Sequence, residues 1–228
     1  MPWTVDSTTF RAAPTGPWQT PLGAALAVAE AQPAMAVDAW APSAELDVDP
    51  SEYHVSQYPG ATNTQERTRN NGNCGPVCTL MALKAFGRLD PTPAEVNAVV
   101  AEIRRRGGAP REERVGHGSA TATHHLARAA RAYGLEAVEG DGQKLADVEA
   151  ALAAGKLVIV LVRPGAYTRS SSTGHYVLVT GMRDGKVIVN DPAQQTSCRE
   201  IDATLFARAM ALKGGLTVTL GEPAAPAT

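Results

Sequence analysis

The chain has 228 residues, 44% of them hydrophobic, so it can bury one substantial core with a small appended segment, but two large domains would be crowded. Its 21 basic and 23 acidic residues give a net charge of -2, which provides no global attraction to nucleic acid or to an anionic membrane. The N-terminus lacks a basic segment followed by an apolar one, and no stretch approaches 18 consecutive apolar residues. We therefore expect no signal peptide and no transmembrane segment, and a protein that is cytoplasmic or exported by a non-Sec bacterial system.

Residues 1–50 differ in composition from the rest of the chain. They are rich in Ala, Pro, Ser and Thr, and the recurring prolines disfavour long regular elements. We interpret them as an N-terminal arm, which could pack on the main domain, cover its functional site as a pro-segment, or act as a secretion signal of a toxin or effector. The main domain is then expected at 51–222, and a disordered tail at 223–228.

A cysteine at position 74 follows a Gly/Asn turn and precedes an apolar run. Asn71-Gly72 favours a tight turn, Gly75 is expected to let a substrate backbone approach, and Pro76 suits the first position of a helix that we predict over 76–86. The unpaired N–H groups and the positive dipole end of such a helix favour thiolate over thiol. This setting predicts that Cys74 is a nucleophile.

Two further helices are predicted before the sheet begins. Residues 93–106 repeat apolar side chains on one face and end in Arg104-Arg105-Arg106, which we interpret as a solvated helix end. A polar connection at 107–118 could border a substrate cleft. Residues 119–133 form the next helix, whose His124-His125 pair combines with the cysteines in no standard zinc spacing, so we predict no metal site.

The predicted sheet begins after a short helix at 145–154. Residues 157–162 are apolar without interruption, which is typical of a central strand covered on both faces. The following loop, residues 164–173, is a candidate wall of a cleft because it leads directly to His175, the residue that opens the next strand.

The segment from His175 to Asp191 predicts an antiparallel hairpin. Its two strand-like runs are separated by a turn at 183–186, and pairing them returns Asp191 to the side of His175. A carboxylate there can fix the tautomer of the ring and stabilise its charged form. Asn190 is the alternative orienting group, and only one of the two can face His175 because side chains alternate along a strand.

The remaining predicted elements complete an α+β arrangement. A strand at 199–201, a helix at 203–210 and a strand at 216–220 follow the hairpin. Helices thus come first and a mostly antiparallel sheet with one inserted helix follows, which places a helix-borne cysteine opposite a sheet-borne histidine. Of the other thiols, Cys78 is expected to be a structural core residue and Cys198 to be incidental.

Three motifs in this order carry a family resemblance. With Asn73-Cys74-Gly75-Pro76 opening a helix, Gly174-His175-Tyr176 opening a strand and Asn190-Asp191-Pro192 closing the next, the chain resembles papain-like cysteine peptidases over about residues 60–220. Among these it looks most like the bacteriocin-leader-processing peptidases and their stand-alone bacterial relatives. The resemblance implies a papain-like fold with N-terminal helices packed on the sheet. It also implies that Cys74 is the nucleophile, His175 the general base and acid, and Asp191 the orienting residue.

The implied function is that of a cysteine peptidase or amide hydrolase. It would form a thioester acyl-enzyme on a peptide, isopeptide or side-chain amide, without a cofactor and with a peptide or protein as its partner. A deamidase, an acyl or transglutaminase-type transferase, and an inactive peptide-binding module of the same fold are the alternatives. The oligomeric state is left open.

The resemblance also implies a glutamine that helps to bind the oxyanion, about half a dozen residues before the nucleophile. Here that position is Thr68. Gln65 lies nine residues upstream of Cys74, and Asn70, Asn71 and Asn73 lie closer. We expect one of these side chains, with Gln65 and Asn71 as the named candidates, to complete an oxyanion hole with the Cys74 backbone N–H.

Overall fold

A six-stranded antiparallel sheet forms the frame of the domain. The computed structural model describes residues 48–57, 72–109, 121–170, 172 and 174–224. In this part of the chain the strand order is β1-β6-β2-β3-β4-β5, and every neighbouring pair is antiparallel. The strands are β1 (Glu136–Gly140), β2 (Leu157–Val162), β3 (His175–Arg183), β4 (Lys186–Asn190), β5 (Arg199–Asp202) and β6 (Thr217–Gly221).

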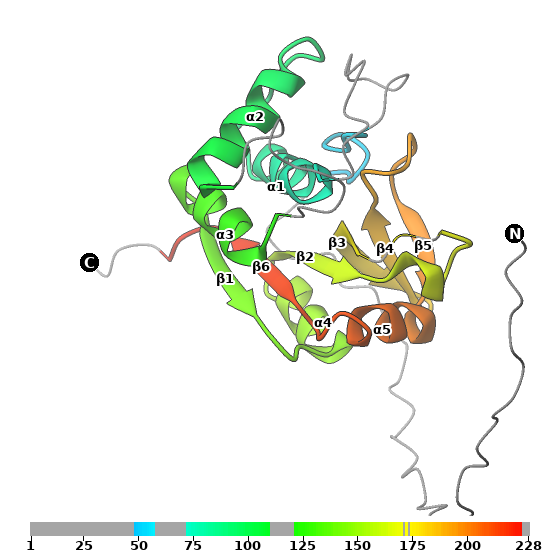
Figure 1. Ribbon diagram of the computed structural model, residues 1–228. Helices are drawn as coiled ribbons and strands as arrows, with labels where there is room; N and C mark the ends of the chain where they lie inside the picture. Colours follow the sequence, from blue (N-terminus) through cyan, green and yellow to red (C-terminus); the bar gives the residue numbers. More distant parts are fainter. Residues whose placement is uncertain (1–47, 58–71, 110–120, 171, 173, 225–228) are drawn as a thin grey trace, which may run out of the picture. The chain divides into compact units, whose positions relative to one another are not determined.

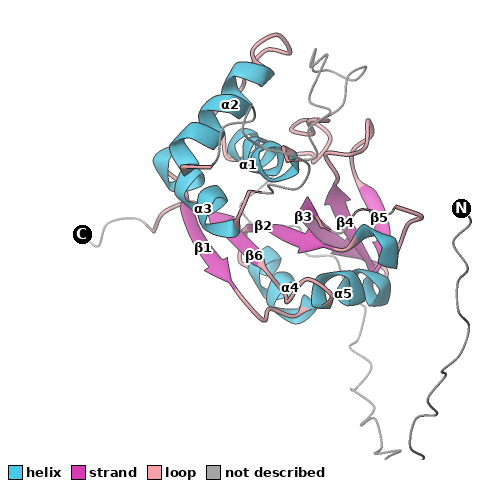
Figure 2. Cartoon of the chain, viewed as in Figure 1, coloured by secondary structure: helices cyan, strands magenta, loops and turns pink. Residues whose placement is uncertain are grey.

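Helices cover both faces of this sheet (Figure 1). On one face α1 and α3 pack directly on the strands, and α2 packs across these two helices. On the other face lie α4 and α5 (Figure 2). The helices are α1 (Cys74–Ala85), α2 (Val96–Gly107), α3 (Thr123–Ala132), α4 (Leu145–Ala153) and α5 (Ala203–Ala211), with a 3-10 turn η2 (Pro164–Ala166) after β2.

Strand β2 shows why the sequence needs helices on both faces. Its Leu157 and Ile159 belong to the hydrophobic core under α1 and α3, whereas Val158, Val160 and Val162 belong to the core under α4 and α5. Successive side chains of a strand point to opposite faces, so a continuous apolar run is stable only where both faces are covered. The prediction of a central strand at 157–162 and the predicted α+β fold are confirmed, and the two C-terminal helices extend the expected packing to the second face.

The β3–β4 hairpin brings the two motifs of the sheet together. At its turn, Asp184 and Gly185 have φ of 50° and 68°, which is the pair of positive values required by a type I′ turn. The ladder pairs Leu178 with Asn190. Continuing this register by one residue beyond the end of β4 places Asp191 opposite Val177. His175, two residues before Val177, is then the diagonal neighbour of Asp191 on the same face of the sheet. The predicted hairpin is confirmed, and its register explains why the aspartate rather than the asparagine reaches the histidine.

Some predicted boundaries were wrong. Helix α1 begins at Cys74 itself, so Pro76 occupies the third helical position, which is still inside the first turn where an N–H would have no helical acceptor. Strand β1 was not predicted because its five residues, Glu-Ala-Val-Glu-Gly, carry little apolar pattern, and it lies at the edge of the sheet.

Of the predicted arm, all but residues 48–50 lie outside the described residues. In the part of the chain that is described, no helix is long and apolar enough to cross a bilayer.

Candidate active site

Cys74 lies at the N-terminal end of α1, where that helix meets β3. Its thiol is buried and is hydrogen-bonded to the side chain of His175 and to the backbone amides of Tyr176 and Gly75. These amides belong to the start of β3 and to the first turn of α1, whose N–H groups have no helical acceptors. Each of these contacts, together with the helix dipole, stabilises negative charge on the sulfur.

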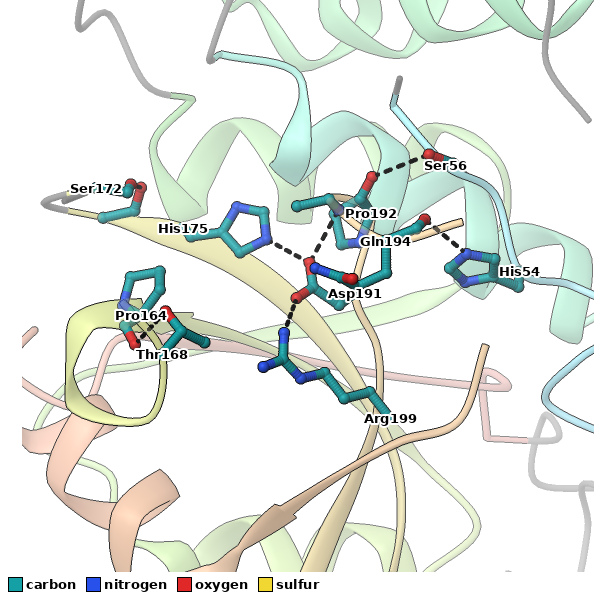
Figure 3. Close-up of polar contacts among 12 residues, drawn as sticks. His54, Ser56, Pro164, Thr168, Ser172, His175, Asp191, Pro192, Gln194 and Arg199 are labelled. Atoms are coloured by element: carbon teal, nitrogen blue, oxygen red, sulfur yellow. Dashed lines mark hydrogen bonds and ion pairs between the residues drawn. The ribbon is translucent and has the colours of Figure 1, made fainter. Parts of the chain in front are cut away.

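Asp191 contacts the opposite side of the histidine ring. The Nε2 atom of His175 lies 2.6 Å from Asp191 Oδ1, which also accepts a hydrogen bond of 2.9 Å from the backbone N–H of Ala193 (Figure 3). Since Nε2 is occupied by the carboxylate, Nδ1 is the ring atom left to face Cys74. The structure therefore brings all three predicted residues into one continuous set of contacts, thiol to imidazole to carboxylate.

The electrostatics of this set favour the charged form of each group. Burial opposes a charged ring at His175, but the hydrogen bonds to Asp191 and Cys74 outweigh it and raise the pKa of His175 to about 10. Burial likewise opposes the thiolate, yet the contact with His175 and the two backbone N–H groups lower the pKa of Cys74 below its ordinary value. Thiol and imidazole titrate as a coupled pair. Both shifts in pKa favour a thiolate–imidazolium pair over a neutral thiol and imidazole.

Asp191 stays ionised for a similar reason. Burial alone would raise the pKa of its carboxyl group, but the hydrogen bond to His175, the charge on that ring and the Ala193 N–H lower it. Arg199 adds an ion pair of 3.3 Å to the second oxygen, Oδ2. All oxygen contacts of this carboxylate thus come from donors, which suits a permanently charged orienting group.

Residues 48–57 hold the turn that carries Asp191. Asn190 donates a hydrogen bond of 2.7 Å from its side chain to the carbonyl of Pro50, and the Gln57 N–H donates one of 2.7 Å to the carbonyl of Pro192. His54 Nε2 donates to the carbonyl of Gln194 at 3.2 Å (Figure 3). Asn190, the alternative orienting residue, is therefore used in scaffolding rather than at the histidine.

The loop before His175 is ordered by its own hydroxyl groups. Thr168 donates to the carbonyl of Pro164 at 2.9 Å and accepts from the N–H of Ser170 at 3.0 Å. Ser172 donates to the carbonyl of Gly174 at 2.9 Å, directly before the histidine. These contacts limit how far the start of β3 can move. The expectation that this loop borders a cleft stays a prediction.

Arg104 supports the turn before Cys74 and corrects the sequence interpretation. It was expected at a solvated helix end, but its side chain is buried and only 4% of the residue is exposed. Its Nη1 donates to the carbonyl of Gly72 at 2.9 Å and to Asn73 Oδ1 at 3.0 Å, and Thr121 adds a donor to the same Gly72 carbonyl. A single arginine therefore joins α2 to the two residues that precede the thiol.

Gly75 is explained by packing. A Cβ atom at this position would lie 3.0 Å and 3.1 Å from the methyl groups of Leu126 and 3.1 Å from the ring of Tyr176. Glycine is thus what lets the first turn of α1 approach α3 and β3 closely. Its expected role in admitting a substrate backbone stays a prediction.

The two oxyanion candidates, Gln65 and Asn71, lie outside the described residues. Asn73 is described, and its side-chain oxygen is bound by Arg104. A glutamine that the sequence reasoning passed over lies at position 57, 17 residues upstream of Cys74; only 4% of it is exposed, and its backbone binds the residue after Asp191. The available signal was the alternation of the segment, since Gln57 continues the every-second-residue spacing of the buried Tyr53 and Val55.

Within the described part of the chain, the other cysteines and histidines form no second cluster. Cys78 is fully buried in the core, where burial and then the nearby Cys74 charge raise the pKa of its thiol, as expected for a structural residue. His124 and His125 contact one another at the start of α3, and His125 Nδ1 accepts the N–H of Ala122. Among the described residues, no group of three or more His, Cys, Asp or Glu side chains could hold a metal ion.

The comparison with family models places this arrangement in a known group. The model of the peptidase C39-like family matches residues 54–212, which is well over half of the chain and includes all three site residues. The chain belongs to the peptidase C39-like family. No curated protein matches the chain.

Solved structures of C39 peptidases share the fold. A C39-like peptidase from Bacillus anthracis superposes with a TM-score of 0.55 at 13% identity, over 82% of this chain and 99% of the other. The peptidase domain of Streptococcus ComA, a bifunctional ABC transporter involved in quorum sensing, gives a TM-score of 0.51 at 15% identity, over 75% and 99% of the two chains. At such identities the similarity establishes the papain-like C39 fold, which confirms the expected fold class.

Arg104 provides a test of how the thiol-bearing turn is held. Replacing Arg104 with Ala removes donors from the buried Gly72 carbonyl and from Asn73, so we expect the free energy of unfolding to fall by about 2 kcal/mol. Arg105 is the matched control, since this neighbouring arginine is exposed and forms an ion pair with Glu102 on its own helix. Chemical denaturation measures both variants. Equal effects of Arg104→Ala and Arg105→Ala would contradict the structural role of Arg104.

Proposed function

We propose that this protein is a cysteine peptidase in which Cys74 is the nucleophile, His175 the general base and acid, and Asp191 the orienting carboxylate. The observation that carries the proposal is the uninterrupted series of contacts from the Cys74 thiol through the imidazole of His175 to Asp191. Membership of a peptidase family supports the same reaction. Nucleophile, base and orienting group in contact are the arrangement that thiol catalysis requires.

In the proposed reaction the Cys74 thiolate attacks the carbonyl carbon of a peptide bond and forms a tetrahedral adduct. The proton on His175 Nδ1 passes to the leaving amine, the C–N bond breaks, and a thioester remains on the sulfur. His175, now neutral, takes a proton from water, which attacks the thioester and releases the acid. Asp191 keeps Nε2 protonated throughout, so Nδ1 is the nitrogen that exchanges the proton.

The proposed oxyanion hole uses the backbone N–H of Cys74 and the side-chain amide of Gln57. The amide of Cys74 lies at the start of α1, where no helical carbonyl accepts it. Gln57 is buried and is attached through its backbone to Pro192, next to the orienting aspartate. An amide N–H at that place can stabilise the charge that develops on the attacked oxygen. Gln65 and Asn71 are the competing assignments from the sequence.

Replacement of the nucleophile tests the proposed reaction. We expect the wild-type protein to cleave members of a mixed peptide library and to be alkylated by iodoacetamide at Cys74, as followed by mass spectrometry. Cys74→Ala should lose the alkylation and reduce cleavage at least about 1000-fold, because no other group can form the acyl-enzyme. Cys198→Ser, at a half-buried free thiol outside the site, is the control.

Persistent cleavage by Cys74→Ala would overturn the mechanism. Peptide binding without alkylation or cleavage by the wild-type protein would instead favour an inactive peptide-binding module. Added hydroxylamine or amines separate hydrolysis from transfer, since a transferase diverts the thioester to the added nucleophile.

The oxyanion assignment has its own test. Gln57→Ala should lower kcat about 100-fold while leaving the rate of iodoacetamide alkylation of Cys74 unchanged, because alkylation develops no oxyanion. Gln65→Ala and Asn71→Ala are the matched controls and should retain kcat. A loss confined to one of these two would move the assignment to that residue.

A further inference from the structure

Arg199 lies behind the proposed catalytic groups and contacts Asp191 from the side opposite His175. It is the first residue of β5 and pairs across the ladder with Val189, two residues before Asp191 on β4. The loop between them therefore returns the guanidinium group to the carboxylate. Nη1 lies 3.3 Å from Oδ2, whereas His175 binds Oδ1 (Figure 3). Each oxygen of the carboxylate thus faces a different cation.

The position of Arg199 is defined by a second contact. Its guanidinium carbon lies 5.4 Å from the centre of the Tyr167 ring, in the loop that leads to His175. The side chain is 29% exposed, compared with 4% for Asp191, and Asp191 is the only carboxylate within ion-pair distance of Arg199 in the described part of the chain. Arg199 is therefore placed between the Asp191 turn and the loop before the histidine.

The charges of this set alternate. Thiolate at Cys74, imidazolium at His175 and carboxylate at Asp191 sum to a net negative charge, which is costly in a buried site. The guanidinium of Arg199 completes the series and brings the sum to zero. Without the guanidinium, the excess negative charge favours protonation of Asp191 or of the Cys74 thiolate. That protonation would then occur at a higher pH than in the wild-type protein.

Resting on the proposed function, we propose that Arg199 is a positioning residue that keeps Asp191 ionised and its Oδ1 directed at His175, and thereby sets the acid limit of the pH range in which the thiolate is available. Its guanidinium fixes Oδ2, so the carboxylate cannot rotate away from the ring. It also offsets the charge of the set without touching the reacting atoms. A lysine at position 199 would keep the positive charge of Arg199 but not the planar geometry of its guanidinium group.

Other groups that act on Asp191 stay the same when Arg199 is changed. They come from each element around it, and they are His175 on β3, Tyr167 after η2, His54 on the 48–57 segment and Cys78 on α1. Of these, only His175 is a cation at neutral pH, since burial lowers the pKa of His54 and raises that of Tyr167 and of Cys78. Arg199 is thus the one additional cation described against the carboxylate.

The test is the pH profile of iodoacetamide alkylation of Cys74 in the full chain. We expect the acid limb of Arg199→Met to move upward by about one pH unit, so that alkylation at pH 5 falls about 10-fold and alkylation at pH 8 changes little. Arg199→Gln, which keeps a donor without the charge, should shift in the same direction. Arg199→Lys should return the limb to its wild-type position. Arg183→Met is the control, because it removes an equal charge that pairs with Glu200 on the surface.

The outcomes separate this inference from the proposed function. If Cys74 of the wild-type protein is not alkylated at pH values below the ordinary pKa of a thiol, the proposed function itself is refuted. A normal wild-type profile with an unshifted limb in the folded Met or Gln variant would overturn only the role of Arg199. A uniform loss at every pH, or a shift equal in Arg199→Lys and Arg199→Gln, would likewise reject a charge-based role.

Discussion

The hydrogen bond between His175 and Asp191 is the constraint on which the rest of the site depends. It joins the beginning of β3 to the residue that follows β4, and it fixes which ring nitrogen is left for Cys74. A buried imidazolium is stable only when its charge is compensated. Here the Cys74 thiol lies on one side of the ring and the Asp191 carboxylate on the other, and their contacts raise the pKa of this buried histidine.

The surrounding structure fixes the ends of the elements that meet at this bond. Arg104 and Thr121 hold the turn before α1, and residues 48–57 hold the turn after β4. The two hydrophobic cores on opposite faces of the sheet keep β2 and β3 in place beneath them. The three groups proposed to react therefore lie at the termini of rigid elements, and contacts from several parts of the chain direct their side chains, as preorganised catalysis would require.

The sequence was most informative where the decisive contacts are local. The Asp184-Gly185 turn and the alternating runs around it suffice to pair β3 with β4 and to return Asp191 to His175. The position of Cys74 at a helix start was likewise readable from its Gly, Asn and Pro neighbours. The alternation of side chains along a strand already showed that only one of Asn190 and Asp191 can face His175. The register of the β3–β4 ladder then decided that this residue is Asp191.

The unpredicted features depend on contacts between distant segments. Nothing near Arg104 distinguishes it from the exposed Arg105, because its burial follows from the crossing of α2 over the start of α1. Gln57, the residue now proposed for the oxyanion hole, was passed over because the expected spacing from the thiol directed attention to positions 65–73. The 48–57 segment is instead located by its bonds to residues 190–194. Arg199 looked like an ordinary strand residue until the β4–β5 ladder placed it beside Asp191.

The most direct test is whether the ring of His175 is protonated at neutral pH, which nitrogen-15 NMR of labelled histidine can measure. The folded pKa lies above the ordinary value of 6.5, so the charged ring stabilises the fold fully below that value, and this contribution is lost as the pH rises through about 10. We predict that one of the five histidines, absent from the spectrum of His175→Gln, stays protonated past pH 8 and loses its proton near pH 10. In Asp191→Asn that transition should move down toward the ordinary value. A wild-type His175 ring that is already neutral at pH 7 would contradict the ion pair at the centre of the site.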